Sequence, residues 1–248
     1  MEFIAYNDYI LNETYESFVE LKMLVNDILN AYNTNKINVY DIYALAKFTK
    51  RSYKILSKEF LFKTGFIIGR IYAGGTSKGR FFPPSQYTEC KTFLNPYKHK
   101  QSIFFKDPLS KYTNGTIIIW EDSIHNNTII HELQHAWDNY RSKGKFDIST
   151  SANKFRETLK KKEDLSKNDT LELYVRSAHE ISAFFIAAIN DLDFFYSKDT
   201  DFKSFKVMYD EFKSIYQGYD YLDEISKRIL ARKFSQYYYK IREQKDYE

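Results

Sequence analysis

The sequence lacks several features that would place it in a special class of protein. It has one cysteine, Cys90, so no disulfide can form within the chain. Its longest apolar run, residues 181–189, includes Ser182 and is far shorter than the roughly 20 residues of a membrane-spanning helix. Its first eight residues are partly acidic and polar, unlike a secretory signal. We therefore expect no membrane span, no signal peptide, and a cytoplasmic or virion-associated location.

The sequence also lacks a strong excess of one charge. It has 37 basic and 33 acidic residues, for a net charge of +4, which is too balanced to argue for nucleic-acid binding. Its 43% hydrophobic and 28% charged residues are ordinary for a globular protein. A chain of 248 residues is long enough to bury a substantial core. We expect a single domain over residues 1–248 and no nucleic-acid partner.

Aromatic residues are abundant, with 22 Tyr and 21 Phe. Tyr, Phe, Lys, Asn and Ile share AT-rich codons, so the excess first indicates a genome bias of the kind seen in many phages and some low-GC bacteria. It indicates nothing about function. If the source is a phage or virus, a virion or host protein becomes a candidate partner.

The spacing of apolar residues predicts an α+β protein with a small sheet between two groups of helices. Short runs of β-branched and aromatic residues divided by turn residues predict the strands. In chain order we expect N-terminal helices over about residues 13–62, a small sheet over about 65–122, catalytic helices over about 126–192 and C-terminal helices over about 202–243.

More local expectations accompany this outline. Asn12 is expected to cap the first helix, and a second helical stretch is expected to begin near Asn38. The glycine-rich residues 73–80 lack the spacing of a phosphate-binding loop and are expected to form a hairpin or flap. The strands are expected at residues 66–72, 102–105 and 116–120, and a helix is expected at residues 152–162.

Residues 131–135 read His-Glu-Leu-Gln-His, and the pattern around them is helical. Histidines four positions apart lie on one face of a helix, so both imidazoles of His131 and His135 can reach one Zn²⁺ ion. Glu132 can reach a zinc-bound water without binding the metal, which makes it the candidate general base. The alternative is two surface histidines on an amphipathic helix.

The sequence around the motif supports a helix with defined ends. Asn127 or Thr128 is expected to cap its start, and Gly144 lies where a C-terminal cap would sit. No further His follows at the spacing of a metzincin, so the third ligand must come from elsewhere. The best candidate is Glu180 on a later helix. The adjacent His179 is a rival that points about 100° away from Glu180.

Residues 131–140, His-Glu-Leu-Gln-His-Ala-Trp-Asp-Asn-Tyr, resemble the gluzincin type of zincin metallopeptidase. Over residues 116–190 the chain is similar to the catalytic domain of anthrax lethal factor. The resemblance implies a zincin-like fold with several helices packed around the HExxH helix, and a glutamate third ligand on a later helix, for which Glu180 is the match. It also implies Tyr174 as an oxyanion donor and Asp138 as a residue that orients a ligand histidine or fixes the helix end.

The resemblance further implies that the strand at residues 116–120 borders the cleft and pairs with an extended substrate, a role that fails if this strand is central. Thermolysin-like enzymes carry a supporting Asp four residues after the ligand Glu, where this chain has Phe184. The family within the gluzincins therefore stays open.

We expect a zinc-dependent metallopeptidase that acts on a protein or peptide substrate. The alternative is a virion-associated or toxin-type structural protein that keeps a zinc site with little or no turnover. An intact Glu132 favours the enzyme.

Overall fold

A computed structural model describes residues 14–35, 39–41, 52–69, 78–88, 90, 112–144, 174, 178–196 and 203–245. The chain divides into two compact units. The sheet unit is Glu20–Thr150, and the helical unit combines Met1–Val19 with Ser151–Glu248. The mixture of helices with a small sheet confirms the expected α+β class. The expectation of a single domain stays a prediction.

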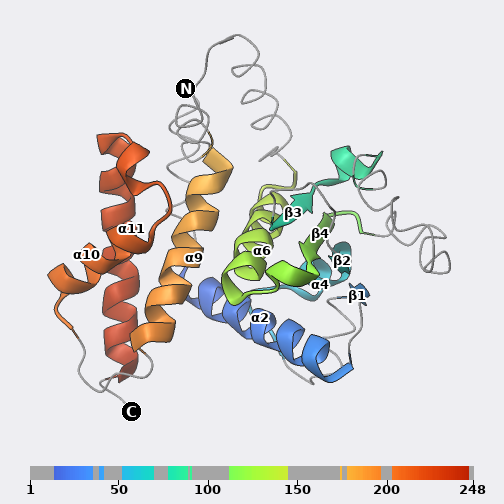
Figure 1. Ribbon diagram of the computed structural model, residues 1–248, viewed down its shortest axis with the longest axis horizontal. Coiled ribbons are helices and arrows are strands. Elements are labelled where there is room, and N and C mark those ends of the chain that lie inside the picture. Colours follow the sequence, from blue (N-terminus) through green and yellow to red (C-terminus); the bar gives the residue numbers. More distant parts are fainter. Residues whose placement is uncertain are drawn as a thin grey trace, which may run out of the picture. The chain divides into compact units, whose positions relative to one another are not determined.

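The sheet unit contains a four-stranded sheet with the order β1-β2-β4-β3. β2 and β4 run parallel, whereas β1 pairs with β2 and β3 pairs with β4 in antiparallel fashion. All six residues of β4 are buried. β4 is therefore a central strand of the described sheet, and β3 is one of its edges. The strands are β1 Val39–Asp41, β2 Thr64–Gly69, β3 Gly79–Phe82 and β4 Gly115–Trp120 (Figure 1).

One expectation for the N-terminal half is wrong. Val39–Asp41 form the strand β1 where a helix was expected to begin, and the short helix α4 spans Lys58–Lys63. Residues 42–51 lie outside the described part of the chain. The hairpin or flap expected at residues 73–80 lies mostly outside the described residues, and its last two residues, Gly79 and Arg80, begin β3. The strand expected at residues 102–105 lies outside the described residues.

The first helix, α2, spans Tyr15–Asn35, as its apolar spacing predicts. Thr14 caps it, because the Ser17 N–H donates to the Thr14 hydroxyl oxygen at 3.2 Å. The expected cap, Asn12, lies outside the described residues.

Within the sheet unit, the Glu20 side chain fastens α2 to the segment before α4. Its carboxylate accepts three backbone N–H groups, from Lys54 at 2.6 Å, Ile55 at 2.8 Å and Leu56 at 2.7 Å. Hydrogen bonds to a charged group contribute about 1.5–3 kcal/mol each. Glu20 thus gives this irregular segment a fixed place beside the helix.

The helix that carries the motif, α6, spans Asn126–Arg141 and packs against β3 and β4 (Figure 1). His125 occupies its N-cap position without a side-chain cap bond, so the expected capping by Asn127 or Thr128 is wrong. The other end matches the expectation for Gly144. Gly144 N–H donates to the Asn139 carbonyl at 2.9 Å and Lys143 N–H donates to the Tyr140 carbonyl at 3.0 Å, as in a Schellman motif.

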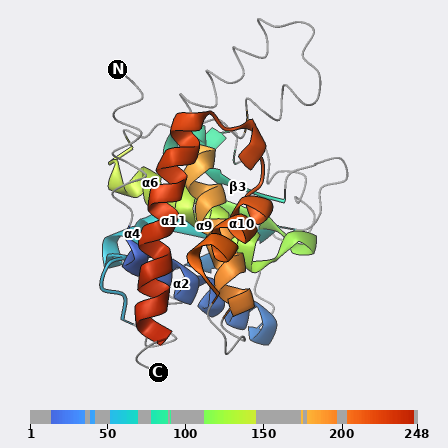
Figure 2. The same cartoon turned by 90° about the vertical axis from the view of Figure 1, so that its left-hand side faces the viewer.

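The helical unit contains α9 Ala178–Tyr196, α10 Phe205–Ile215 and α11 Glu224–Lys245, side by side in Figures 1 and 2. α10 and α11 confirm the two C-terminal helices expected. The start of α2 belongs to the same unit, since the Tyr15 ring meets the Tyr237 ring edge-on at 5.5 Å. Tyr237 also donates its hydroxyl to the Thr14 carbonyl at 3.2 Å. The helix expected at residues 152–162 lies outside the described residues.

Short 3-10 helices cover Pro84–Gln86, Glu121–Ser123 and Tyr219–Tyr221. Among the helices that the structure describes, none combines the length and the apolar character that a bilayer crossing requires.

Candidate metal centre

The two motif histidines face each other on α6. Their Nε2 atoms lie 3.1 Å apart, and their ring centroids are 4.7 Å apart at an interplanar angle of 89°. Two nitrogen ligands at 2.0–2.1 Å from a tetrahedral zinc ion would be separated by about 3.3 Å. The pair therefore fits two positions of one zinc site. The same separation also suits an N–H···N hydrogen bond between His131 and His135.

Glu132 lies where α6 meets the edge strand β3. Its side chain is buried, with 7% of its surface exposed. A β-carbon placed on Gly79 would be 3.3 Å from Cγ of Glu132 and 3.2 Å from Cγ2 of Thr128. The backbone of β3 therefore passes directly over the side chain of the candidate base.

The substrate-pairing role expected for residues 116–120 is wrong, because β4 lies between β2 and β3 and is paired on both edges. The described sheet instead offers β3 as its edge next to α6. Trp120 N–H donates to the Lys78 carbonyl at 3.3 Å, which makes Lys78 and Trp120 a hydrogen-bonded pair. Because such pairs alternate in an antiparallel ladder, Gly79 and Phe81 direct their N–H and C=O groups away from β4.

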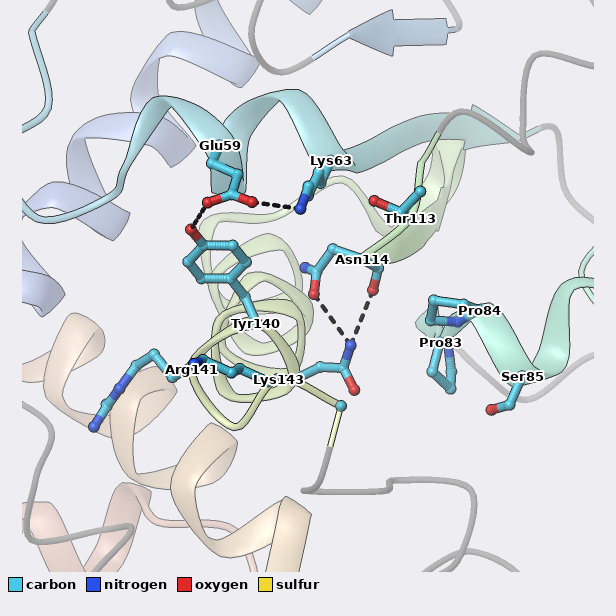
Figure 3. A pocket seen from close by; sticks show the side chains of 12 residues that line it. Glu59, Lys63, Pro83, Pro84, Ser85, Thr113, Asn114, Tyr140, Arg141 and Lys143 are labelled. Carbon is cyan, nitrogen blue, oxygen red and sulfur yellow. Dashed lines mark hydrogen bonds and ion pairs between the residues drawn. The ribbon is translucent and has the colours of Figure 1, made fainter.

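Residues that follow the motif anchor α6 to α4. The Trp137 ring meets the Phe60 ring edge-on at 5.1 Å and stacks on Tyr140 at 5.7 Å. The Tyr140 hydroxyl donates to Glu59 Oε2 at 3.0 Å (Figure 3). It also lies 2.8 Å from the Ser57 hydroxyl. Hydrogen bonds from Lys63 and then from Tyr140 hold the pKa of Glu59 below its usual value. These contacts give Trp137 and Tyr140 a structural role, which is to pack α6 against α4.

Asn139 joins the same end of α6 to the sheet. Its amide donates to the backbone carbonyl and the side-chain oxygen of Asn114, both at 3.1 Å (Figure 3). Asn114 in turn donates to the Thr64 hydroxyl at 2.9 Å and to the Ala136 carbonyl at 3.0 Å. This buried network fixes how far α6 extends along β2 and β4, and so where its histidines lie in the sheet unit.

A cavity of about 690 Å³ opens beside this network, between the C-terminal end of α6 and the turn at Pro83 and Pro84. Arg141 also lines this cavity, and its side chain points away from Asn114 in Figure 3. His131, Glu132 and His135 are not among the residues that line the cavity. We therefore treat it as separate from the candidate metal centre.

Asp138 is buried, with 1% of its surface exposed. Its carboxylate accepts a hydrogen bond from the Gln134 amide at 2.9 Å, and its backbone carbonyl accepts the Ser142 N–H at 3.1 Å. The backbone contact helps to end the helix. A direct role for the carboxylate in orienting a histidine stays a prediction.

The helical unit holds the other two predicted site residues. Glu180 lies in the first turn of α9 and is 4% exposed, and Tyr174 is half-buried. His131 and His135 of the sheet unit and Glu180 of the helical unit each have a side-chain atom of the kind that binds a metal. Because the histidines belong to the sheet unit, the ligand role of Glu180 and the oxyanion role of Tyr174 stay predictions. The side chain of the rival, His179, lies outside the described part of the structure.

Comparisons with models of known protein families, with curated proteins and with solved structures found no significant match.

Proposed function

We propose that this protein is a zinc-dependent metallopeptidase. The observation that carries the proposal is the 3.1 Å separation of the His131 and His135 Nε2 atoms on one helix, with Glu132 buried next to His131. A pair of imidazoles with a neighbouring carboxylate is the arrangement that zinc-dependent hydrolysis uses. The resemblance of residues 131–140 to gluzincins supports peptide bonds as the substrate.

Glu180 is proposed as the third ligand. Glu180 is buried, with 4% of its surface exposed, and a buried carboxylate is stabilised by a partner of opposite charge. A metal ion would supply that partner. The gluzincin resemblance, in which the third ligand is a glutamate on a later helix, points to the same residue.

In the proposed reaction each group has a separate task. Bound zinc would lower the pKa of a water molecule to about 7. Glu132 accepts the proton of that water and delivers it to the leaving amine. Tyr174 is the proposed hydrogen-bond donor to the scissile carbonyl oxygen as negative charge develops there.

Metal analysis combined with a peptide-library cleavage assay tests the function. The purified chain is expected to contain about one zinc per molecule and to cleave a subset of peptides. Removing zinc with a chelator should stop cleavage, and adding zinc back should restore it. A folded chain that neither contains zinc nor takes it up would refute the proposal.

Gly79→Ala is expected to lower kcat about tenfold while zinc content stays unchanged. The new methyl group would press on Cδ1 of Ile119 and lie 3.3 Å from Cγ of Glu132, and small shifts of a catalytic group are costly. Steady-state kinetics and metal analysis on the same preparation would measure both effects.

The control for this variant is the same substitution combined with Ile119→Val. Valine removes the Cδ1 atom that the alanine would strike, while the contact with Glu132 remains. Activity should therefore stay low in the double variant. Full recovery would mean that the loss came from packing against Ile119 and not from Glu132.

A further inference from the structure

Helix α10 contacts the first turn of α9 through Tyr216. This residue ends α10, where its backbone N–H donates to the Phe212 carbonyl at 2.8 Å. Its side chain is 2% exposed, and its hydroxyl donates to the Ile181 carbonyl at 3.2 Å. Ile181 directly follows Glu180. The hydrogen bond thus reaches the backbone next to the proposed third ligand.

Aromatic contacts extend this connection within the helical unit. Phe184 lies one turn after Glu180 on α9, and its ring meets Tyr216 at 6.2 Å and Tyr174 at 6.0 Å, both nearly edge-on. Phe212 also meets Tyr216, at 5.6 Å. Tyr216 and Phe184 therefore link α10 to the part of α9 that carries Glu180, and to Tyr174.

The surroundings of Tyr216 keep its hydroxyl a donor. Burial, and then the negative charge of Glu180, raise the pKa of Tyr216 well above its usual value. The neutral hydroxyl can therefore donate at any physiological pH.

We propose that Tyr216 is a positioning residue that braces the first turn of α9 and so holds Glu180 in the orientation that metal binding requires. This inference rests on the proposed function. If Tyr216 has this role, α10 supports a proposed metal ligand although it lies far from the motif in the sequence. Tyr216 touches neither substrate nor metal in this role, and acts through the Ile181 carbonyl and the Phe184 ring.

The test is Tyr216→Phe in the full chain, which removes the hydroxyl and keeps the ring. Zinc affinity, measured by competition with a chromophoric chelator, is expected to fall about tenfold, the lower range for losing a group that supports a ligand. The absorption spectrum of the cobalt-substituted protein should change. In zinc-free protein, amide hydrogen exchange in the first turns of α9 should become faster.

Tyr238→Phe is the matched control. Tyr238 is 4% exposed and donates its hydroxyl to the Lys203 carbonyl at 3.2 Å, so the substitution removes an equivalent bond in the same unit. Its zinc affinity and cobalt spectrum should match the wild type. Equal zinc affinities for Tyr216→Phe and Tyr238→Phe would overturn the positioning role.

His135→Ala separates failure of this inference from failure of the proposed function. If His135→Ala loses zinc but Tyr216→Phe binds it as the wild type does, only the role of Tyr216 is refuted. If His135→Ala keeps its zinc affinity, the metal centre itself is refuted, and the inference about Tyr216 is refuted with it.

Discussion

Glu132→Gln is expected to lower peptide hydrolysis by about 10²–10⁴-fold, the usual contribution of a general base, while zinc content stays the same. Glutamine has nearly the same shape as glutamate, so it can fill the buried space between α6 and Gly79. Its amide cannot accept a proton from the attacking water. Single-turnover cleavage of a fluorogenic peptide and metal analysis would measure the two quantities.

Glu59→Gln is a suitable control for this prediction. Glu59 is a carboxylate in the same unit as Glu132. It also contacts α6, but through Tyr140 at the C-terminal end of that helix. Its substitution should leave hydrolysis unchanged. Activity retained in Glu132→Gln would remove Glu132 as the base. A wild-type protein that binds zinc and cleaves nothing would instead favour a structural role for the site.

His135→Ala is expected to weaken zinc binding by more than a hundredfold, because it removes a direct ligand and even the loss of an outer group costs tenfold to a hundredfold. Glu180→Ala should weaken binding by at least tenfold. Both affinities can be measured by chelator competition, with circular dichroism to confirm folding.

His125→Ala provides the control on the same helix. His125 is an exposed residue at the N-cap position of α6 and makes no side-chain cap bond. Its removal should leave zinc affinity as in the wild type. If Glu180→Ala also binds zinc normally while His135→Ala does not, another residue must supply the third ligand.

The sequence was most informative about α6 because the signals there are local. The spacing of His131 and His135 and the apolar residues between them specify a helix face, and Gly144 marks its end. A helix places residues four apart together whatever surrounds it. The geometry of the histidine pair could therefore be predicted before the fold was known, and its 3.1 Å Nε2 separation agrees with that prediction.

The order of the strands could not be read in the same way. Residues 116–120 form a strand as expected, yet whether that strand is central or at an edge depends on partners 34 to 51 residues away, in β3 and β2. β3 was not predicted as a strand, because its first two residues fall within the glycine-rich stretch 73–80 that was predicted as a hairpin or flap. The run Gly79–Phe82, with two aromatic residues next to a turn, was the available signal.

Tyr216 could not be identified from sequence either, since it is one of 22 tyrosines and its importance lies in a single contact to the Ile181 carbonyl. The prediction of a helix beginning near Asn38 failed for a similar reason. Apolar residues at helical spacing follow Asn38, and a strand of only three residues, Val39–Asp41, has too little sequence to show a pattern of its own. Short strands depend on pairing more than on their own composition.

The contact between Tyr237 and Thr14 has a consequence for the order in which the protein is made. The chain leaves the ribosome from its N-terminus, and the sheet unit is complete once residue 150 has emerged. The helical unit can complete its packing only after α11 has been made, because Tyr237 of α11 contacts Thr14 and Tyr15 at the start of α2. The two histidines are thus in place early, whereas Glu180, the proposed third ligand, belongs to the unit that is complete only after α11 has been made.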